Sequence, residues 1–178
     1  MIRRLLDRLY DAAGYMAAFF VFAIFVSMLA TTIMRESGLR TGGWEDVVSW
    51  LTAAAAFFGL AHTFKHGDFV RVELLMSNLK PAPRRALELF ALLAGTVFVG
   101  YLAVSTTAYV HQSWVFGDMS GGLIVVPIWV PQLSFVFGSW LLFIAIVDEL
   151  VLVLRGARPT YVTAVEERHA RGDFTEDV

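Results

Sequence analysis

Long stretches without charged residues decide what this chain can fold into. Residues 12–34, 47–64 and 89–116 contain no Asp, Glu, Lys or Arg, and a fourth apolar stretch runs from about 128 to 154. The shortest of them has 18 residues. At the helical rise of about 1.5 Å per residue, it nearly spans the roughly 30 Å of hydrocarbon in a bilayer. The pattern predicts an all-α integral membrane protein with four transmembrane helices.

Composition agrees with that prediction. Hydrophobic residues make up 57% of the chain and charged residues 17%, with a mean hydropathy of +0.64, whereas a soluble domain has about 45–50% apolar and about 25% charged residues. The first span is too long for the apolar region of a cleaved signal peptide, so we expect the protein to retain it. We expect one domain over residues 1–155 and a polar cytoplasmic tail over 156–178, with spans at about 12–34, 44–64, 87–113 and 128–154.

The distribution of Lys and Arg predicts the orientation. Cations gather in the N-terminal segment, in residues 65–88 and in the tail, which together hold twelve, whereas the two remaining links hold two. Lys and Arg close to span ends favour the cytoplasmic side of a membrane. Both termini are therefore expected in the cytoplasm.

The second span has marked ends and a small-residue surface. It begins at residues 44–46 with a Trp followed by two acids, and it ends at Lys65. This arrangement matches the helix dipole, which favours acids at the start and cations at the end. Ala53–Ala56 and Gly59 let another helix approach closely. We expect this span to be the most enclosed of the four.

Two connecting segments have their own patterns. The apolar residues of 72–79 recur at helical spacing, which predicts a short interfacial helix between spans two and three. Residues 80–85 contain two prolines, which break the chain before the third span. Ahead of the fourth span, Pro127 and Pro131 interrupt an apolar run. We interpret that run as a re-entrant or interfacial approach.

Glu45 and Asp46, at the outer end of the second span, have two interpretations. In the structural one they are helix-end acids that pair with Arg35 or Arg40. In the functional one they orient the helix against a partner subunit or contact a docking protein outside. A proton or sodium relay is disfavoured, because carboxylates at the bilayer edge need no special partner.

Asp148 and Glu149 lie late in the fourth span, close to its cytoplasmic boundary. A structural ion pair is the favoured interpretation, although ionisable groups in membrane helices also raise a functional possibility. Candidate cations for the pair are Lys65, Arg84, Arg85 and Arg155.

Three histidines near span ends are candidate haem or metal ligands. His62 lies near the cytoplasmic end of span two and His111 near the outer end of span three, so one iron cannot join them. His62 and His66 are four residues apart, a spacing that can hold a metal, but no third ligand is evident nearby. We therefore expect no metal and no cofactor in this chain.

The sequence also lacks the marks of an enzyme. It has no Cys, and so no disulfide, thiolate metal site or cysteine nucleophile. It has neither a phosphate-binding glycine loop with its Lys nor a Gly-x-Ser-x-Gly motif. We expect no catalytic residues and no enzymatic activity.

Several short motifs follow one another in an order typical of a transporter family. Trp44-Glu45-Asp46 opens the second span, and Gly59 lies within it. Lys65-His66-Gly67-Asp68 and Val70-Arg71-Val72-Glu73-Leu74 form the turn, and Val126-Pro127-Ile128-Trp129 precedes the fourth span. In these motifs, their spacing and their orientation, the chain resembles the small membrane subunit of tripartite ATP-independent periplasmic (TRAP) transporters, the DctQ type.

That resemblance implies a division of labour. A periplasmic solute-binding protein captures an organic acid, and a large DctM-type membrane subunit carries the substrate and sodium sites. The small subunit is then a scaffold in sodium-coupled uptake, in the lipid bilayer of a bacterial or archaeal inner membrane, with no nucleic-acid partner. The family often has His at the position of Phe69, so a role of that imidazole does not transfer. The implied structural or partner-interface residues are Trp44, Glu45, Asp46, Gly59, Lys65, Gly67, Arg71, Pro127 and Trp129.

Two alternatives stay open at this point. One is a membrane protein that anchors haem or another redox centre, and the other is a small transporter that works as its own oligomer. The transported solute cannot be read from this chain, because the resemblance places the residues that choose it in other subunits.

Overall fold

The computed structural model of the chain describes residues 2–66 and 81–156. In them it contains four helices, α1 (Ile2–Glu36), α2 (Trp44–His66), α4 (Pro81–Phe116) and α5 (Trp129–Leu154). All four are long and apolar enough to cross a membrane. The prediction of an all-helical protein with four membrane-spanning helices is confirmed. The predicted interfacial helix and the tail lie outside the described residues.

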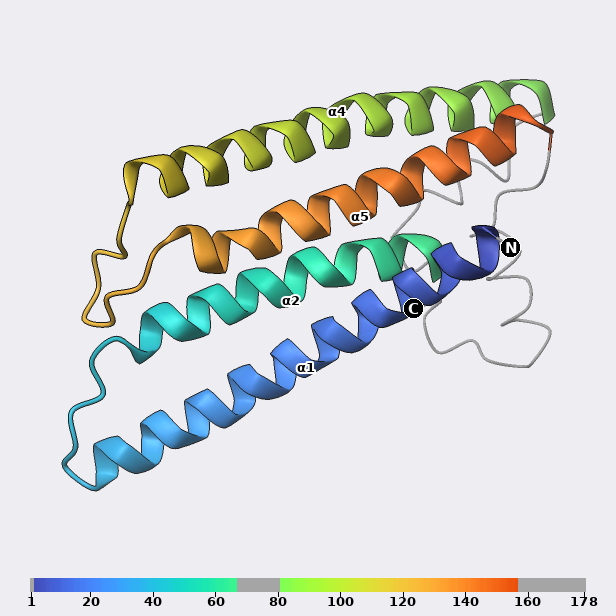
Figure 1. Ribbon diagram of the computed structural model, residues 1–178. Helices are drawn as coiled ribbons and strands as arrows, with labels where there is room; N and C mark the ends of the chain where they lie inside the picture. Colours follow the sequence, from blue (N-terminus) through green and yellow to red (C-terminus); the bar gives the residue numbers. More distant parts are fainter. Residues whose placement is uncertain (1, 67–80, 157–178) are drawn as a thin grey trace, which may run out of the picture.

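The helices form a single layer, in the order α1, α2, α5, α4 (Figure 1). α2 packs against α1 on one side and against α5 on the other, and α4 packs against α5. The links 37–43 and 117–128 lie at the same end of the row, which we call the loop end. At the opposite end, the terminal end, α1 and α4 begin and α2 and α5 finish.

The helices are longer than the apolar spans within them. α1 begins at Ile2, ahead of its uncharged run, and α4 begins at Pro81 and ends at Phe116. Both prolines of residues 80–85 therefore lie in the first turn of α4. Proline is tolerated there because the first turn of a helix has no intrahelical partner for its N–H groups.

The prediction that the second span is the most enclosed is wrong. Eight residues of α5 are buried, against three of α2. In a single layer each helix is covered only along the lines that face its neighbours. α5 has buried side chains on both sides. Leu142 and Ile146 pack against Leu92 and Val99 of α4, and Ala145 packs against Ala61 of α2. The alanines of α2 let α5 approach but offer little side chain to bury.

α2 and α5 approach each other closely at Gly138. A Cβ added to Gly138 would lie 2.5 Å from the backbone oxygen of Phe57, so only glycine fits there. Next to it, Ser139 is fully buried, and its hydroxyl lies 3.2 Å from that of Thr106 on α4. Small residues thus hold α5 against both of its neighbours, as in other membrane helix pairs.

Residues 117–128 fold back on themselves at the loop end. The Ser120 N–H donates to the Val126 carbonyl at 2.8 Å, and the Ile128 N–H donates to the Asp118 carbonyl at 3.0 Å. The Ser120 hydroxyl donates to the Ile124 carbonyl at 2.5 Å and accepts from the Val126 N–H at 3.1 Å. We call this segment the hairpin. It brings Trp129 to the start of α5.

Candidate functional site

Two polar clusters occupy the terminal end of the row, and both include residues from the end of α2. The first, which we call the ion cluster, consists of Lys65, Asp148 and Glu149 and joins α2 to α5. The second, the histidine cluster, consists of Asp11, His62 and His66 and joins α1 to α2. Together the two clusters link α1, α2 and α5 at the terminal end.

The ion cluster is buried. The Lys65 ammonium lies 2.9 Å from Asp148 Oδ2 and 3.8 Å from Glu149 Oε2. Lys65 is 7% exposed and Glu149 is 0% exposed. Charges in such an environment are tolerated when they are paired, because the pairing offsets the loss of hydration. The predicted structural ion pair of Asp148 and Glu149 is confirmed, with Lys65 as its cation.

Tyr10 closes the ion cluster from the side of α1. Its side chain is fully buried, and the Lys65 ammonium lies 5.5 Å from the centre of its ring. A cation within about 6 Å of an aromatic ring is attracted to the face of that ring. Tyr10 also packs against Ala61 and Ala145. α1 is thus joined to the ion cluster by an aromatic contact.

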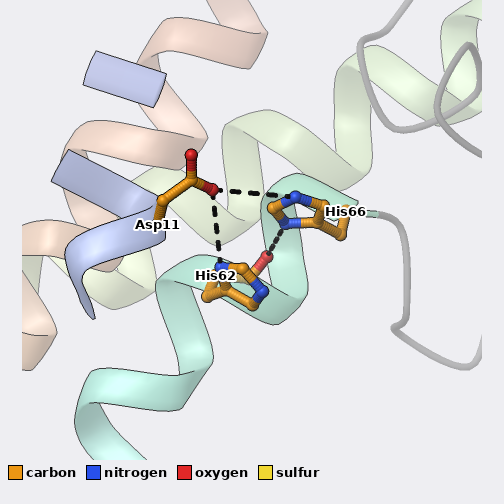
Figure 2. Close-up of side chains that lie close together, drawn as sticks. All are labelled: Asp11, His62 and His66. Carbon is orange, nitrogen blue, oxygen red and sulfur yellow. Dashed lines mark hydrogen bonds and ion pairs between the residues drawn. The ribbon is translucent and has the colours of Figure 1, made fainter. Parts of the chain in front are cut away.

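The histidine cluster is adjacent to the ion cluster along the chain, since His66 directly follows Lys65, and its side chains are more exposed. Asp11 Oδ1 is 4.0 Å from His62 Nδ1 and 3.9 Å from His66 Nε2 (Figure 2). The two imidazole rings are tilted by 33° to one another, with centroids 4.1 Å apart. Both carboxylate contacts use one oxygen, so the three side chains converge on one point.

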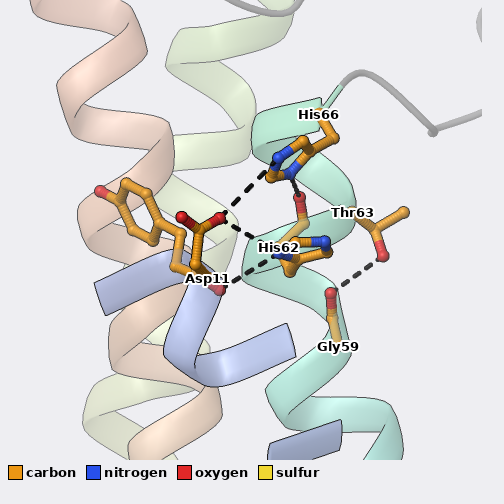
Figure 3. Close-up of polar contacts among 6 residues, drawn as sticks. Asp11, Gly59, His62, Thr63 and His66 are labelled. Atoms are coloured by element: carbon orange, nitrogen blue, oxygen red, sulfur yellow. Dashed lines mark hydrogen bonds and ion pairs between the residues drawn. The ribbon is translucent and has the colours of Figure 1, made fainter. Parts of the chain in front are cut away.

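The backbone orients the two imidazoles. His66 Nδ1 lies 3.0 Å from the carbonyl oxygen of His62, and His62 Nδ1 lies 3.2 Å from that of Tyr10 (Figure 3). A carbonyl only accepts, so each contact places the ring proton on Nδ1. Gly14 makes room for this arrangement, because a Cβ there would lie 2.7 Å from His62 Nδ1. The ring of His62 therefore rests directly on the backbone of α1.

The structure supplies a third candidate ligand that is not evident near His62 and His66 in the sequence. This group is Asp11, and one ligand atom from each of the three residues lies within 4.8 Å of the others. Asp11 is far away in the sequence, which is why the motif search did not reach it. The sequence signal for this site would have been two His residues four positions apart at the end of α2, together with an acidic residue near the start of the antiparallel helix α1. His111, on the exposed side of α4 near the loop end, takes no part.

At the loop end, the acids at the start of α2 do not make the expected ion pairs. Within residues 2–66 and 81–156, neither Glu45 nor Asp46 pairs with Arg35 or Arg40. Asp46 instead lies directly against Gly122 of the hairpin. Both acids occupy the first turn of α2, where the partial positive charge of the helix end favours them.

The remaining predicted residues divide between the two ends of the row. Pro127 pairs with Met119 in the hairpin, and Trp129 is the first residue of α5. Gly59 faces Ala17 of α1, and its carbonyl accepts a hydrogen bond from Thr63 at 2.9 Å (Figure 3). The predicted residues Gly67 and Arg71 lie outside the described residues.

Comparison with known protein families identifies the chain. The family described as tripartite ATP-independent periplasmic transporters, DctQ component, matches residues 24–156, which cover the last part of α1 and the whole of α2, α4 and α5. A search among curated proteins finds no match. The family is a transporter component and not an enzyme family, and the four helices make the protein a multi-pass membrane protein. The chain belongs to the DctQ family, the small membrane component of TRAP transporters.

Proposed function

We propose that this chain is a scaffold that supports the large DctM-type membrane subunit in sodium-coupled, binding-protein-dependent uptake of an organic acid. The observation that carries the proposal is the single layer of unbroken helices. Membrane carriers that bind small ions commonly use interrupted helices, whose ends point at the ligand near the middle of the bilayer. From Ile2 to Glu36, Trp44 to His66, Pro81 to Phe116 and Trp129 to Leu154, each helix here is continuous.

The charges within the row also favour a supporting role. Lys65 is held by Asp148 and lies near Glu149, so this buried cation is balanced within the chain. A group that binds an anionic solute would have to exchange such a partner for the solute. The ion cluster therefore acts as a fixed joint between helices.

The outer surfaces of the layer suit contact with lipid and with a second membrane subunit. Large apolar side chains point outwards from α1 and from α4 over their whole length. Contiguous apolar surface of this kind marks membrane or protein contact. The most exposed examples along the two helices are Phe19, Phe22, Phe25, Phe90, Phe98 and Tyr101.

The orientation that we propose places both termini in the cytoplasm, because the cations gather at the terminal end. The ion cluster then lies near the inner surface of a bacterial or archaeal inner membrane. The loop end, with Trp44, Glu45 and Asp46, faces the periplasm, where the solute-binding protein arrives. Sodium and solute are bound by the large subunit, so this chain needs no cofactor for transport.

Reconstitution tests the proposal. The large subunit and the binding protein are placed with liposomes under a sodium gradient, with and without this chain, and uptake of candidate organic acids is measured. Uptake is expected to require all three proteins. Uptake by this chain alone would contradict the scaffold role, and haem absorbance in the purified chain would favour a redox anchor.

A paired variant sharpens the test. Glu45→Ala with Asp46→Ala should weaken assembly or uptake without changing the order of preferred solutes, because these acids lie in the scaffold and not in the solute site. Glu36→Ala is the control. It removes an exposed acid at the last residue of α1, also at the loop end, and should leave assembly and uptake unchanged. An altered solute preference in the double variant would contradict the assignment.

A further inference from the structure

The histidine cluster has a chemistry that the scaffold role does not use. We propose that Asp11, His62 and His66 bind one divalent transition-metal ion of the zinc type, which fastens the start of α1 to the end of α2. The inference rests on the geometry of these three side chains and does not depend on the proposed transport function.

The spacing of the ligand atoms is close to that of a bound metal. Oδ1 of Asp11 is 3.9 Å from His66 Nε2 and 4.0 Å from His62 Nδ1, and one ligand atom from each residue lies within 4.8 Å of the others. Ligands of a tetrahedral zinc ion at bond lengths of about 2.0–2.1 Å stand roughly 3.3 Å apart. To bind an ion, the three groups would have to draw together to about that distance.

The tautomer of His66 supports the same conclusion. With its Nδ1 proton directed at the His62 carbonyl 3.0 Å away, His66 turns the lone pair of Nε2 towards Asp11. Metal-binding histidines usually donate the other ring N–H to a backbone carbonyl or a carboxylate in this way, which fixes the ring. His62 would bind the ion through Nδ1, the atom that faces Asp11. Its ring proton would then lie on Nε2, and its contact with the Tyr10 carbonyl at 3.2 Å would be given up.

The ligand types select the metal. Two imidazole nitrogens and one carboxylate oxygen suit zinc and its neighbours in the first transition row, whereas magnesium and calcium prefer oxygen ligands alone. Three protein ligands leave a fourth position of a tetrahedral ion for water. The chain has no Cys, so thiolates do not compete for the ion.

The surroundings let an ion enter and give it a charge to balance. The side chains of Asp11, His62 and His66 are 53%, 36% and 44% exposed, so the cluster is reached without opening the helix row. In the described residues, the ion-pair partners of Asp11 are these two imidazoles. A divalent cation bound there would balance the charge of the Asp11 carboxylate.

Metal binding to the full chain tests the proposal. The protein is purified with an affinity tag that contains no histidine, equilibrated with Zn²⁺, freed of unbound ion and analysed for metal content, and its affinity is measured by titration calorimetry. We expect one Zn²⁺ per chain. Asp11→Asn and His66→Gln should each weaken binding by more than about tenfold, because even partners outside the ligand set contribute 10–100-fold. Asp7→Asn, one turn earlier on α1, and His111→Gln should bind like the unchanged protein.

Asp11→His separates ligation from charge. This variant removes the carboxylate but supplies a third imidazole, so it should bind Zn²⁺ where Asp11→Asn does not. Far-UV circular dichroism and gel filtration of every variant show that each is folded. The proposal is overturned by the absence of stoichiometric Zn²⁺ in the unchanged protein, by equal binding in Asp11→Asn and Asp7→Asn, or by loss of binding in Asp11→His.

Discussion

The terminal end and the loop end of this protein are joined by different physical means. At the terminal end, three helices meet through side chains: a buried Lys65 between two carboxylates, the ring of Tyr10, and two imidazoles around Asp11. These contacts have long reach, because the groups that make them stand several bonds from the backbone.

At the loop end the helices meet through backbone and through the absence of side chains. A Cβ on Gly43 would lie 2.6 Å from Ile124 Cγ1, and Gly42 lies directly against Leu123. The hairpin is held by backbone hydrogen bonds and by Ser120. Removal of a side chain should therefore destabilise the helix contacts at the terminal end, whereas addition of a side chain should destabilise those at the loop end.

The largest effect is expected from Lys65→Met. The substitution keeps most of the apolar length of the side chain but removes the ammonium that pairs with Asp148 and lies near the fully buried Glu149. Breaking a buried ion pair by removing one partner costs about 3–5 kcal/mol. Reversible unfolding of the chain in mixed micelles should show a loss of that size.

A second substitution identifies the cause of that loss. If unpaired charge is responsible, adding Asp148→Asn and Glu149→Gln to Lys65→Met should restore a large part of the stability, because neutral groups are cheaper to bury. A triple variant as unstable as Lys65→Met alone would assign the loss to packing around the lysine stem.

An intermediate effect is expected from Gly43→Ala at the loop end. Gly43 has φ +88°, and its missing Cβ leaves room for Ile124. Gly38 is the matched control, since it has φ +73° but nothing within 4 Å of an added Cβ. Alanine should cost about 1–2 kcal/mol at both sites through its backbone conformation, and about 1–3 kcal/mol more at Gly43 through overpacking.

Unfolding of the two alanine variants in the same micelles measures the difference between them. That difference reports the contact between the hairpin and the link before α2, because the backbone cost is common to both. Equal stability of Gly43→Ala and Gly38→Ala would mean that the hairpin moves aside freely, and that the loop end is not closed by this contact.

The same comparison explains which parts of the molecule could be predicted from its sequence. The four spans follow from uncharged runs. An ion pair for Asp148 follows because charges late in one span need a partner at the same depth, but the choice of Lys65 among the four candidate cations came from the structure. Both inferences use information that each helix carries by itself or at its ends. The acids at the start of α2 showed the limit, since Asp46 contacts the hairpin and not Arg35 or Arg40.

The order of helices in the row could not be predicted in this way. Whether α2 or α5 is more enclosed depends on which helices lie beside each of them. Hydrophobic periodicity does not determine that order. Asp11 was missed for the same reason, because its closeness to His62 and His66 requires α1 to lie beside α2 in one register. Contacts between distant segments, and so the histidine cluster, came only with the three-dimensional arrangement.

The smallest effect is expected from Ser120→Ala in the hairpin. The hydroxyl both donates to the Ile124 carbonyl and accepts from the Val126 N–H, and a hydrogen bond contributes about 0.5–1.5 kcal/mol net. Hydrogen exchange of the Val126 amide should become about tenfold faster for each 1.4 kcal/mol lost, while the helices keep their protection.

Ser49→Ala is the control for that measurement. The Ser49 hydroxyl also donates to a carbonyl four residues earlier, that of Glu45 at 2.8 Å, but the helix around it is held by its own backbone. Its loss should therefore stay within about 0.5 kcal/mol, as for other exposed positions. If Ser120→Ala leaves Val126 as protected as Ser49→Ala does, the hairpin is held by backbone bonds alone. The Ser120 side chain would then contribute nothing measurable to the stability of the loop end.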